Sequence, residues 1–265
     1  MAVPVELATA AYQGYPPSRH DVVRANLLAA GVPVEPYRLD LAAFERYLRQ
    51  ASYPEAYRRN FGDLFVEKAL EHHVSLELVG RAERPELAID IASCDSPFPE
   101  ISKSWTGIET YRQDLGYPAG VHDMTVGGSA DDLPFADASF TQMTLHCSFE
   151  HFEGEADSRF IREAARTLRR GGRLCILPLY LSDVFHNLTD PGVDRGALFF
   201  DDGAAIAEVT GWNNRFGRVY DVERLRARVL RPAEGAFTPT LFFVENETDV
   251  APVCYLKFVL LLTRR

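Results

Sequence analysis

Short apolar runs alternate with amphipathic segments over most of the chain. The runs at residues 87–91, 141–145 and 174–177 have the length and composition of buried strands. Between the second and third runs, apolar residues recur at helical spacing, with Asp157 placed to cap a helix and Gly171-Gly172 to end it. A strand, a helix and a second strand in this order form a parallel crossover. The pattern therefore predicts an α/β fold.

Further strands are predicted at residues 106–111, 121–126, 238–244 and 254–263. A polar turn joins the last two, which indicates an antiparallel hairpin near the end of the sequence. The expected architecture is a Rossmann-like, mostly parallel sheet of about seven strands, with an antiparallel C-terminal strand and helices on both faces.

The first third of the sequence has helical rather than strand-like periodicity. Helices are predicted over residues 21–30, 40–50 and 54–72. We expect the adjacent His72 and His73 to lie at a solvated helix end rather than to share a metal ion, because neighbouring helix residues point in different directions. The expected organisation is an N-terminal helical cap, residues 1–83, followed by the α/β domain, residues 84–265.

Composition and charge exclude several classes of protein. The 265 residues are 46% hydrophobic, which is enough for a sizeable core. The net charge of −10 argues against a nucleic-acid backbone or an anionic membrane as partner. The four cysteines are far apart, and no apolar run is long enough to cross a membrane. We expect a cytoplasmic, reduced protein that is a monomer or homodimer.

Three segments in the middle of the chain match a known pattern. They are Ser129–Phe135 (SADDLPF), the pair Glu150-His151, and Arg166–Gly172, which reads Arg-x-Leu-x-x-Gly-Gly. In these segments the sequence resembles the class I S-adenosylmethionine-dependent methyltransferases of the type 11 branch. The resemblance implies S-adenosyl-L-methionine as cofactor, N-terminal helices lying over it, and methyl transfer to a small-molecule or glycan-like acceptor.

The first motif of that family is altered here. The family has an acid followed by three glycines at alternate positions, where this chain has Asp90 followed by Ala92, Cys94 and Ser96. These small side chains still let the backbone approach a ligand, but a positive φ would be strained at each of them. Two hypotheses follow: a working cofactor loop, or a noncatalytic pseudo-methyltransferase that serves as a binding or scaffold protein.

The remaining cofactor candidates follow from spacing and from the resemblance. Asp114 lies about 20 residues beyond the turn, where such folds place an acid on the ribose hydroxyls, with Glu109 as the alternative. The resemblance puts Ser129 to Asp131 beside the adenine. The candidate cofactor-binding residues are Asp90, Ala92, Ser93, Cys94, Ser96, Asp114, Ser129, Ala130, Asp131 and His146.

The segment from His146 to His151 carries the candidate catalytic residues. His146 follows a strand, close to where the methyl group would be transferred, and could act as a base, with His151 as the second candidate. Another hypothesis is a metal-dependent enzyme that uses both histidines with Cys147 and Glu150, although their spacing matches no recognised two-ligand motif, so no metal is predicted. Aromatic residues in and beside segment 182–220 would form a lid or an ordinary packed excursion. The candidate substrate residues are Tyr180, His186 and Trp212.

Overall fold

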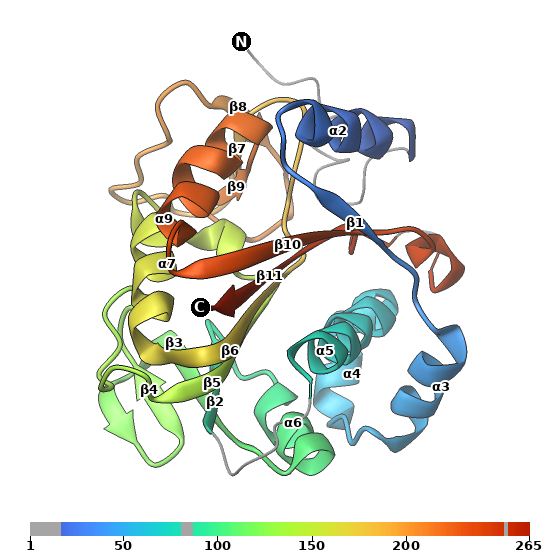
Figure 1. The fold of residues 1–265 in the computed structure, drawn as a ribbon, viewed down its shortest axis with the longest axis vertical. Helices are drawn as coiled ribbons and strands as arrows, with labels where there is room; N and C mark the ends of the chain where they lie inside the picture. The colour runs from blue at the N-terminus through green and yellow to red at the C-terminus, as the bar shows by residue number, and fades with distance from the viewer. Residues whose placement is uncertain (1–16, 81–86, 252–253) are drawn as a thin grey trace.

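The computed structural model describes residues 17–80, 87–251 and 254–265 (Figure 1). An eight-stranded sheet runs through this part of the chain. Its strands, in spatial order, are β4 (Thr125–Gly127), β3 (Glu109–His122), β2 (Leu87–Ile91), β5 (Phe140–His146), β6 (Leu168–Leu177), β11 (Phe258–Arg264), β10 (Phe237–Val244) and β1 (Val34–Tyr37). Neighbours are parallel, except that β11 is antiparallel to both β6 and β10. The predicted Rossmann-like architecture with an antiparallel C-terminal strand is confirmed.

The sheet separates two hydrophobic cores. Along β6, Leu174 and Ile176 point into one core, while Cys175 and Leu177 point into the other, as the two-residue period of a strand requires. The first core is covered by helices α2 (Pro17–Ala29), α7 (Ala156–Thr167) and α8 (Val222–Leu225). The second is covered by α3 (Leu41–Gln50), α5 (Phe65–Val79) and α6 (Phe98–Thr106), which lie together in Figure 1. Helices therefore lie on both faces.

The N-terminal third differs from its prediction in two ways. The predicted helix over residues 54–72 is split into α4 (Glu55–Phe61) and α5 by a turn at Gly62–Leu64, and α5 continues to Val79. In addition, β1 leaves the helices and pairs with β10 at the edge of the sheet. Our expectation of a solvated helix end at His72 and His73 is wrong: their exposed fractions are 1% and 5%. The expected domain boundary after residue 83 lies outside the described residues.

The end of α7 also corrects the sequence interpretation. Gly171 and Gly172 do not end this helix, which stops at Thr167. They lie within β6, at a bulge between two paired stretches of β5 and β6. Gly171 has a φ of +79°, and a Cβ on Gly172 would approach the Arg169 carbonyl oxygen to 2.8 Å. The glycines are therefore required by the bulge.

Asp157 is not the cap of α7, because Glu155 occupies that position. Its carboxylate instead accepts hydrogen bonds from Arg218, Arg228 and the Tyr220 hydroxyl, all within 2.7–2.9 Å. Asp157 and Arg218 are both fully buried. This network joins the start of α7 to the segment that follows β6.

Segment 182–220 contains a second sheet rather than only loops. Its three strands in the described residues are β7 (His186–Thr189), with β8 (Ala205–Glu208) and β9 (Gly217–Val219) on either side. The following chain forms α8, a turn of π-helix at Arg226–Leu230, and α9 (Arg231–Ala233). Among the described residues, none of the helices combines the length and apolar character needed to span a bilayer.

Two other boundaries shift. The strand predicted at 106–111 is preceded by α6, which occupies residues up to Thr106, so β3 begins at Glu109 and runs on to His122. The strand predicted at 121–126 shrinks to β4, because the end of β3 folds back beside it. The order of strands reverses between β2 and β5, and a crevice opens outside their carboxyl ends.

Candidate functional site

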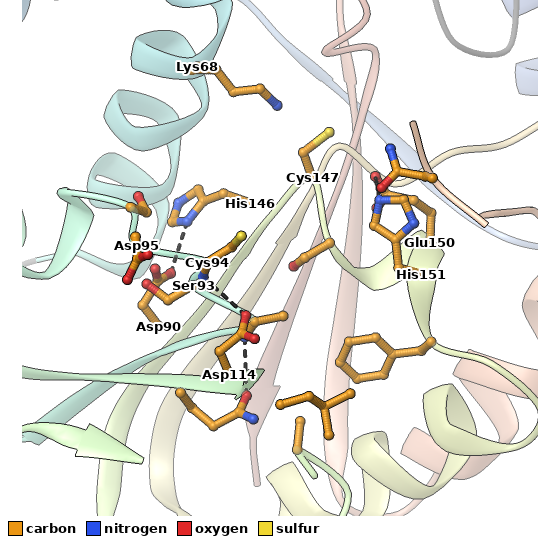
Figure 2. Close-up of a pocket in the computed structure, with 18 of the residues that line it drawn as sticks. Lys68, Asp90, Ser93, Cys94, Asp95, Asp114, His146, Cys147, Glu150 and His151 are labelled. Carbon is orange, nitrogen blue, oxygen red and sulfur yellow. Dashed lines mark hydrogen bonds and ion pairs between the residues drawn. The ribbon is translucent and has the colours of Figure 1, made fainter. Parts of the chain in front are cut away.

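A cavity of about 1200 Å³ lies at the carboxyl ends of β2 and β5 and beside residues 113–115 of β3 (Figure 2). It is lined by all ten candidate cofactor-binding residues, by both candidate catalytic histidines, and by Tyr180 and Trp212. His186 does not line it. That side chain is buried in β7, where its Nδ1 lies 2.8 Å from the Val184 carbonyl oxygen. The structure thus brings together every predicted site residue except His186.

The turn after β2 has a glycine-like backbone without glycines. Ala92 and Cys94 have φ angles of +50° and +43°, whereas Ser96 has no positive φ. A left-handed conformation costs about 1–2 kcal/mol at a residue with a Cβ. Hydrogen bonds from β3 hold the turn: the Ala92 amide donates to Gln113 Oε1 (3.1 Å), and the Cys94 amide donates to Asp114 Oδ2 (3.1 Å). Ala92 and Cys94 therefore have the left-handed backbone that glycine would adopt without strain.

Gln113 is a site residue that the sequence analysis missed. Besides receiving the Ala92 amide, its side chain donates from Nε2 to the Gly128 carbonyl oxygen at 2.6 Å. Its own carbonyl oxygen accepts from the Ser93 amide at 2.8 Å. One buried side chain therefore connects the turn after β2 to the segment after β4. In the sequence, Gln113 is marked as a possible site residue only by its position immediately before Asp114, the candidate ribose acid.

The acids along the cofactor side of the cavity differ in their partners. Asp114 accepts backbone hydrogen bonds from Cys94 and Gly116. Asp131 accepts from the Ser129 hydroxyl and, at 2.6 Å, from Arg159 Nε. Although its partial burial acts in the opposite direction, these hydrogen bonds lower the pKa of Asp131. Both carboxylates are therefore held in place by the protein itself.

His146, at the end of β5, has both ring nitrogens engaged. Nδ1 lies 3.0 Å from Asp90 Oδ1, and Nε2 lies 2.8 Å from Ser75 Oγ. Asp90 Oδ1 also accepts a hydrogen bond from Thr144 at 2.8 Å. The ring is buried and packs against Phe98, with centroids 4.3 Å apart. This arrangement fixes His146 between β2 and α5, and leaves no ring nitrogen available to take a proton from an acceptor.

Helix α5 contributes side chains that we had not expected in the site. The His72 ring lines the cavity between Tyr53, whose hydroxyl lies 2.9 Å from Nδ1, and His146, whose ring centroid is 4.8 Å away. Burial, and then the charge of His146, lower the pKa of His72 well below its usual value, so this ring is neutral. From the same helix, Ser75 contacts His146 and Lys68 reaches the cavity.

Lys68 and Cys147 face each other across the upper part of the cavity in Figure 2. Lys68 Nζ donates to Glu71 Oε1 at 3.0 Å and lies 5.2 Å from the ring centroid of Tyr255. The Cys147 thiol lies 3.4 Å from the Tyr180 hydroxyl. Burial raises the pKa of this thiol far above its usual value, despite the opposing charge of Lys68. Cys147 is therefore a protonated, small side chain and not a nucleophile.

His151 is oriented differently from His146. Its Nδ1 lies 2.6 Å from the Phe216 carbonyl oxygen, and its ring packs on Trp212 at 5.5 Å between centroids. Because a carbonyl oxygen only accepts, Nδ1 carries the hydrogen and Nε2 of the neutral ring has the lone pair. A carboxylate oxygen, Glu150 Oε1, lies 3.7 Å from Nε2. Of the two histidines, His151 has the geometry of a proton acceptor.

Within residues 17–80, 87–251 and 254–265, no three His, Cys, Asp or Glu side chains are grouped so that they could hold a metal ion.

Comparisons with known proteins give one match in sequence and several in structure. Residues 105–176 match the family model described as a methyltransferase domain. No curated protein matches the chain significantly.

Solved structures that resemble this chain are distant in sequence. The 1,6-didemethyltoxoflavin-N1-methyltransferase of Burkholderia thailandensis, crystallised with 1,6-didemethyltoxoflavin and S-adenosylhomocysteine, is 14% identical, with a TM-score of 0.48 over 85% of this chain and 89% of that chain. The geranyl diphosphate C-methyltransferase of Streptomyces coelicolor A3(2) is 13% identical, with a TM-score of 0.48 over 100% and 99%. The PH0226 protein of Pyrococcus horikoshii OT3 is 17% identical, with a TM-score of 0.45 over 83% and 99%. The family match confirms, for residues 105–176, the resemblance to the class I S-adenosylmethionine-dependent methyltransferases that the sequence predicts.

Proposed function

We propose that this chain is an S-adenosylmethionine-dependent methyltransferase that acts on a small-molecule or glycan-like acceptor. The observation that carries the proposal is the turn after β2, where Ala92 and Cys94 keep positive φ angles although no glycine is present. Strained backbone of this kind persists where the surrounding structure holds it in place, and it clusters at active sites and ligand-binding loops. The turn supports a working cofactor loop over a decayed one.

The residues around the cavity fit a cofactor that carries positive charge on sulfur and on an ammonium group. Asp90 and Asp114 supply carboxylates on this side, and Ser93 Oγ is a buried hydroxyl with no hydrogen-bond partner among the described residues. In the proposal, Asp90 and Ala92 to Ser96 hold the methionine end, and Asp114 holds the ribose. Ser129, Ala130 and Asp131 border the adenine.

When bound, S-adenosylmethionine supplies a methyl carbon that is activated by positively charged sulfur. The chain's own contribution is to align the acceptor with that carbon and to exclude water. His146 acts as a positioning residue, because its hydrogen bonds to Asp90 and Ser75 join the cofactor turn to α5. His151 Nε2 is the proposed proton acceptor. Tyr180 and Trp212 are proposed to contact the acceptor, whereas His186 lies outside the cavity.

The N-terminal helices are proposed to act as the cap of this site. Tyr57 and Asn60 of α4 and Lys68 and His72 of α5 line the cavity, opposite the segments that follow β5 and β6. An acceptor bound between these two walls would be shielded from water on both sides. We propose that α4 and α5 are the part of the expected cap, residues 1–83, that covers the site of the methyltransferase domain, residues 84–265, whereas β1 joins the sheet.

The test is calorimetric titration of the full chain with S-adenosylmethionine and S-adenosylhomocysteine. We expect micromolar affinity, reduced at least about tenfold in Asp114→Ala, since a charge-assisted hydrogen bond contributes about 1.5–3 kcal/mol. Asp202→Ala is the matched control, because Asp202 is exposed and does not line the cavity. Absence of binding at millimolar ligand would refute the proposal and favour a pseudo-methyltransferase that serves as a binding or scaffold protein.

A further inference from the structure

Glu150 presents a buried carboxylate oxygen that the protein does not satisfy. The residue is 6% exposed, lines the cavity, and follows the end of β5 in a short helical turn. Its Oε2 has no hydrogen-bond partner among the described residues. Its Oε1 lies 3.7 Å from His151 Nε2. Leaving a buried carboxylate oxygen without a donor costs about 1–3 kcal/mol or more. A ligand that donates a hydrogen bond there would recover this free energy.

The charged side chains facing the cavity make its wall acidic. Among the described residues, its lining contains two Lys or Arg side chains, Lys68 and Arg215, and six carboxylates: Asp90, Asp95, Asp114, Asp131, Glu150 and Glu153. Both cations are already paired: Lys68 with Glu71 at 3.0 Å, and Arg215 with both Glu153 oxygens at 2.7 Å. An anionic acceptor such as a phosphate or carboxylate would therefore enter against the field, whereas a cation would be attracted.

Aromatic rings complete the same part of the cavity. Tyr180 and Tyr255 stack with centroids 6.1 Å apart, and Trp212 packs on the His151 ring beside Glu150. Aromatic faces attract ammonium groups and also cover the apolar body of a small ligand. In Figure 2, Glu150 and His151 lie across the cavity from Asp90 and Asp114, which the proposed function assigns to the cofactor. The space between the two sets is where an acceptor would lie.

We propose that the acceptor is a small organic amine whose N–H group donates to Glu150 Oε2, with the body of the molecule held between the aromatic side chains. This inference rests on the proposed function, because it identifies the space beside Glu150 as the acceptor site. His151 Nε2, next to Glu150, then receives the proton that an ammonium group must lose before its nitrogen can act as a nucleophile.

The experiment compares three probes that share a phenol ring and differ at the end of the side chain: tyramine (amine), tyrosol (alcohol) and 4-hydroxyphenylacetate (carboxylate). Binding to the full chain saturated with S-adenosylhomocysteine is measured by calorimetry. We expect tyramine to bind at least about tenfold more tightly than tyrosol, and the carboxylate to bind most weakly. In Glu150→Gln the preference for the amine should fall below about threefold. Affinity for S-adenosylhomocysteine should not change.

Glu155→Gln is the matched control, because Glu155 is an exposed neighbour that pairs with Arg228 and does not line the cavity. It should keep the full preference for tyramine, and circular dichroism should show that both variants are folded. Equal binding of tyramine and tyrosol, or no tyramine binding at about 10 mM, in a protein that binds S-adenosylhomocysteine would overturn the amine proposal and leave the methyltransferase proposal standing. Failure to bind S-adenosylhomocysteine would overturn both.

Discussion

Replacing Arg218 by methionine removes a fully buried cation from the centre of a hydrogen-bond network. The guanidinium has five N–H donors, and all five are used in the structure. Nε and one terminal nitrogen donate to both oxygens of Asp201 at 2.7 and 2.8 Å, and the other contacts reach Asp157 and the carbonyl oxygens of Phe152 and Gly154. Arg218 therefore fastens β9 and the loop before β8 to the start of α7.

The expected loss of stability follows from the hydrogen-bond donors that Asp157 and Asp201 keep when Arg218 is replaced. Asp157 keeps Arg228 and Tyr220 as donors, but Asp201 loses its ion pair and, in the part of the chain that the structure describes, keeps Asn187 Nδ2 as its one side-chain donor. Removing one partner of a buried ion pair costs about 3–5 kcal/mol. Since a domain is stabilised by about 5–15 kcal/mol in total, Arg218→Met should remove a large share of the free energy of unfolding.

Urea unfolding followed by tryptophan fluorescence measures this loss. The double variant Arg218→Met with Asp201→Asn should recover at least about 1 kcal/mol relative to Arg218→Met, because a neutral amide does not need the lost cation. Arg226→Met is the control: this side chain makes an exposed contact with the Ala30 carbonyl oxygen at 3.3 Å, and its loss should cost less than about 0.5 kcal/mol. A loss below about 1 kcal/mol in Arg218→Met, or no recovery in the double variant, would refute the reasoning.

Three further predictions concern the turn and the buried acids. Cys94→Gly should raise the free energy of unfolding, measured by thermal melting, by about 0.5–1 kcal/mol, because relief of the left-handed strain exceeds the entropy cost of glycine. A lower free energy of unfolding in this variant would show that the turn is unstrained. Gln113→Ala should cost about 2–3 kcal/mol in urea, since two amide hydrogen bonds are lost, and a neutral result would contradict its bridging role. Burial, and then the negative charge of Glu71, raise the pKa of the Glu67 carboxyl from 4.5 to about 8. The folded state therefore keeps Glu67 protonated up to a higher pH than the unfolded state does. The free energy of unfolding should therefore fall as pH rises from about 4.5 to about 8, by about 1.4 kcal/mol per pH unit and about 5 kcal/mol in total. Urea unfolding at several pH values measures this fall, which should be smaller in Glu67→Gln.

The central strands could be predicted from the sequence because burial on both faces favours short segments rich in apolar residues, although Asp90 interrupts β2 and polar residues also lie within β5. β2 occupies the residues predicted for it, and β5 extends its prediction by one residue at each end. The edge strand β1 gave no such signal. Its sequence is Val-Glu-Pro-Tyr, its side chains are half-buried or exposed, and Pro36 is typical of an edge rather than of a strand interior. Its partner β10 lies about two hundred residues away, so only the tertiary structure reveals the pairing.

Two kinds of residue form the candidate site, and only one kind follows from topology. Residues at the carboxyl ends of β2 and β5 must lie at the crevice of such a sheet, which is why the segments beginning at Ala92 and at His146 could be assigned to it. His72 and Lys68 reach the cavity from a helix, and nothing in a strand pattern predicts which face of that helix meets the sheet. A weak signal did exist: Lys68, His72 and Ser75 are polar residues at i, i+4 and i+7, so they share one face of the helix.

This division bears on how the acceptor is chosen. The segment that matches the methyltransferase model, residues 105–176, contributes Asp114, His146 and Glu150 to the cavity. Other parts of the lining come from α4 and α5, before that segment, and from the region of Tyr180, Trp212 and Tyr255, after it. Ser75 and His72 contact His146 and Ser96, so a change in the position of α5 would also move the cofactor turn. We therefore expect substitutions on the inner face of α5 to alter acceptor and cofactor binding together, whereas substitutions at Trp212 alter acceptor binding alone.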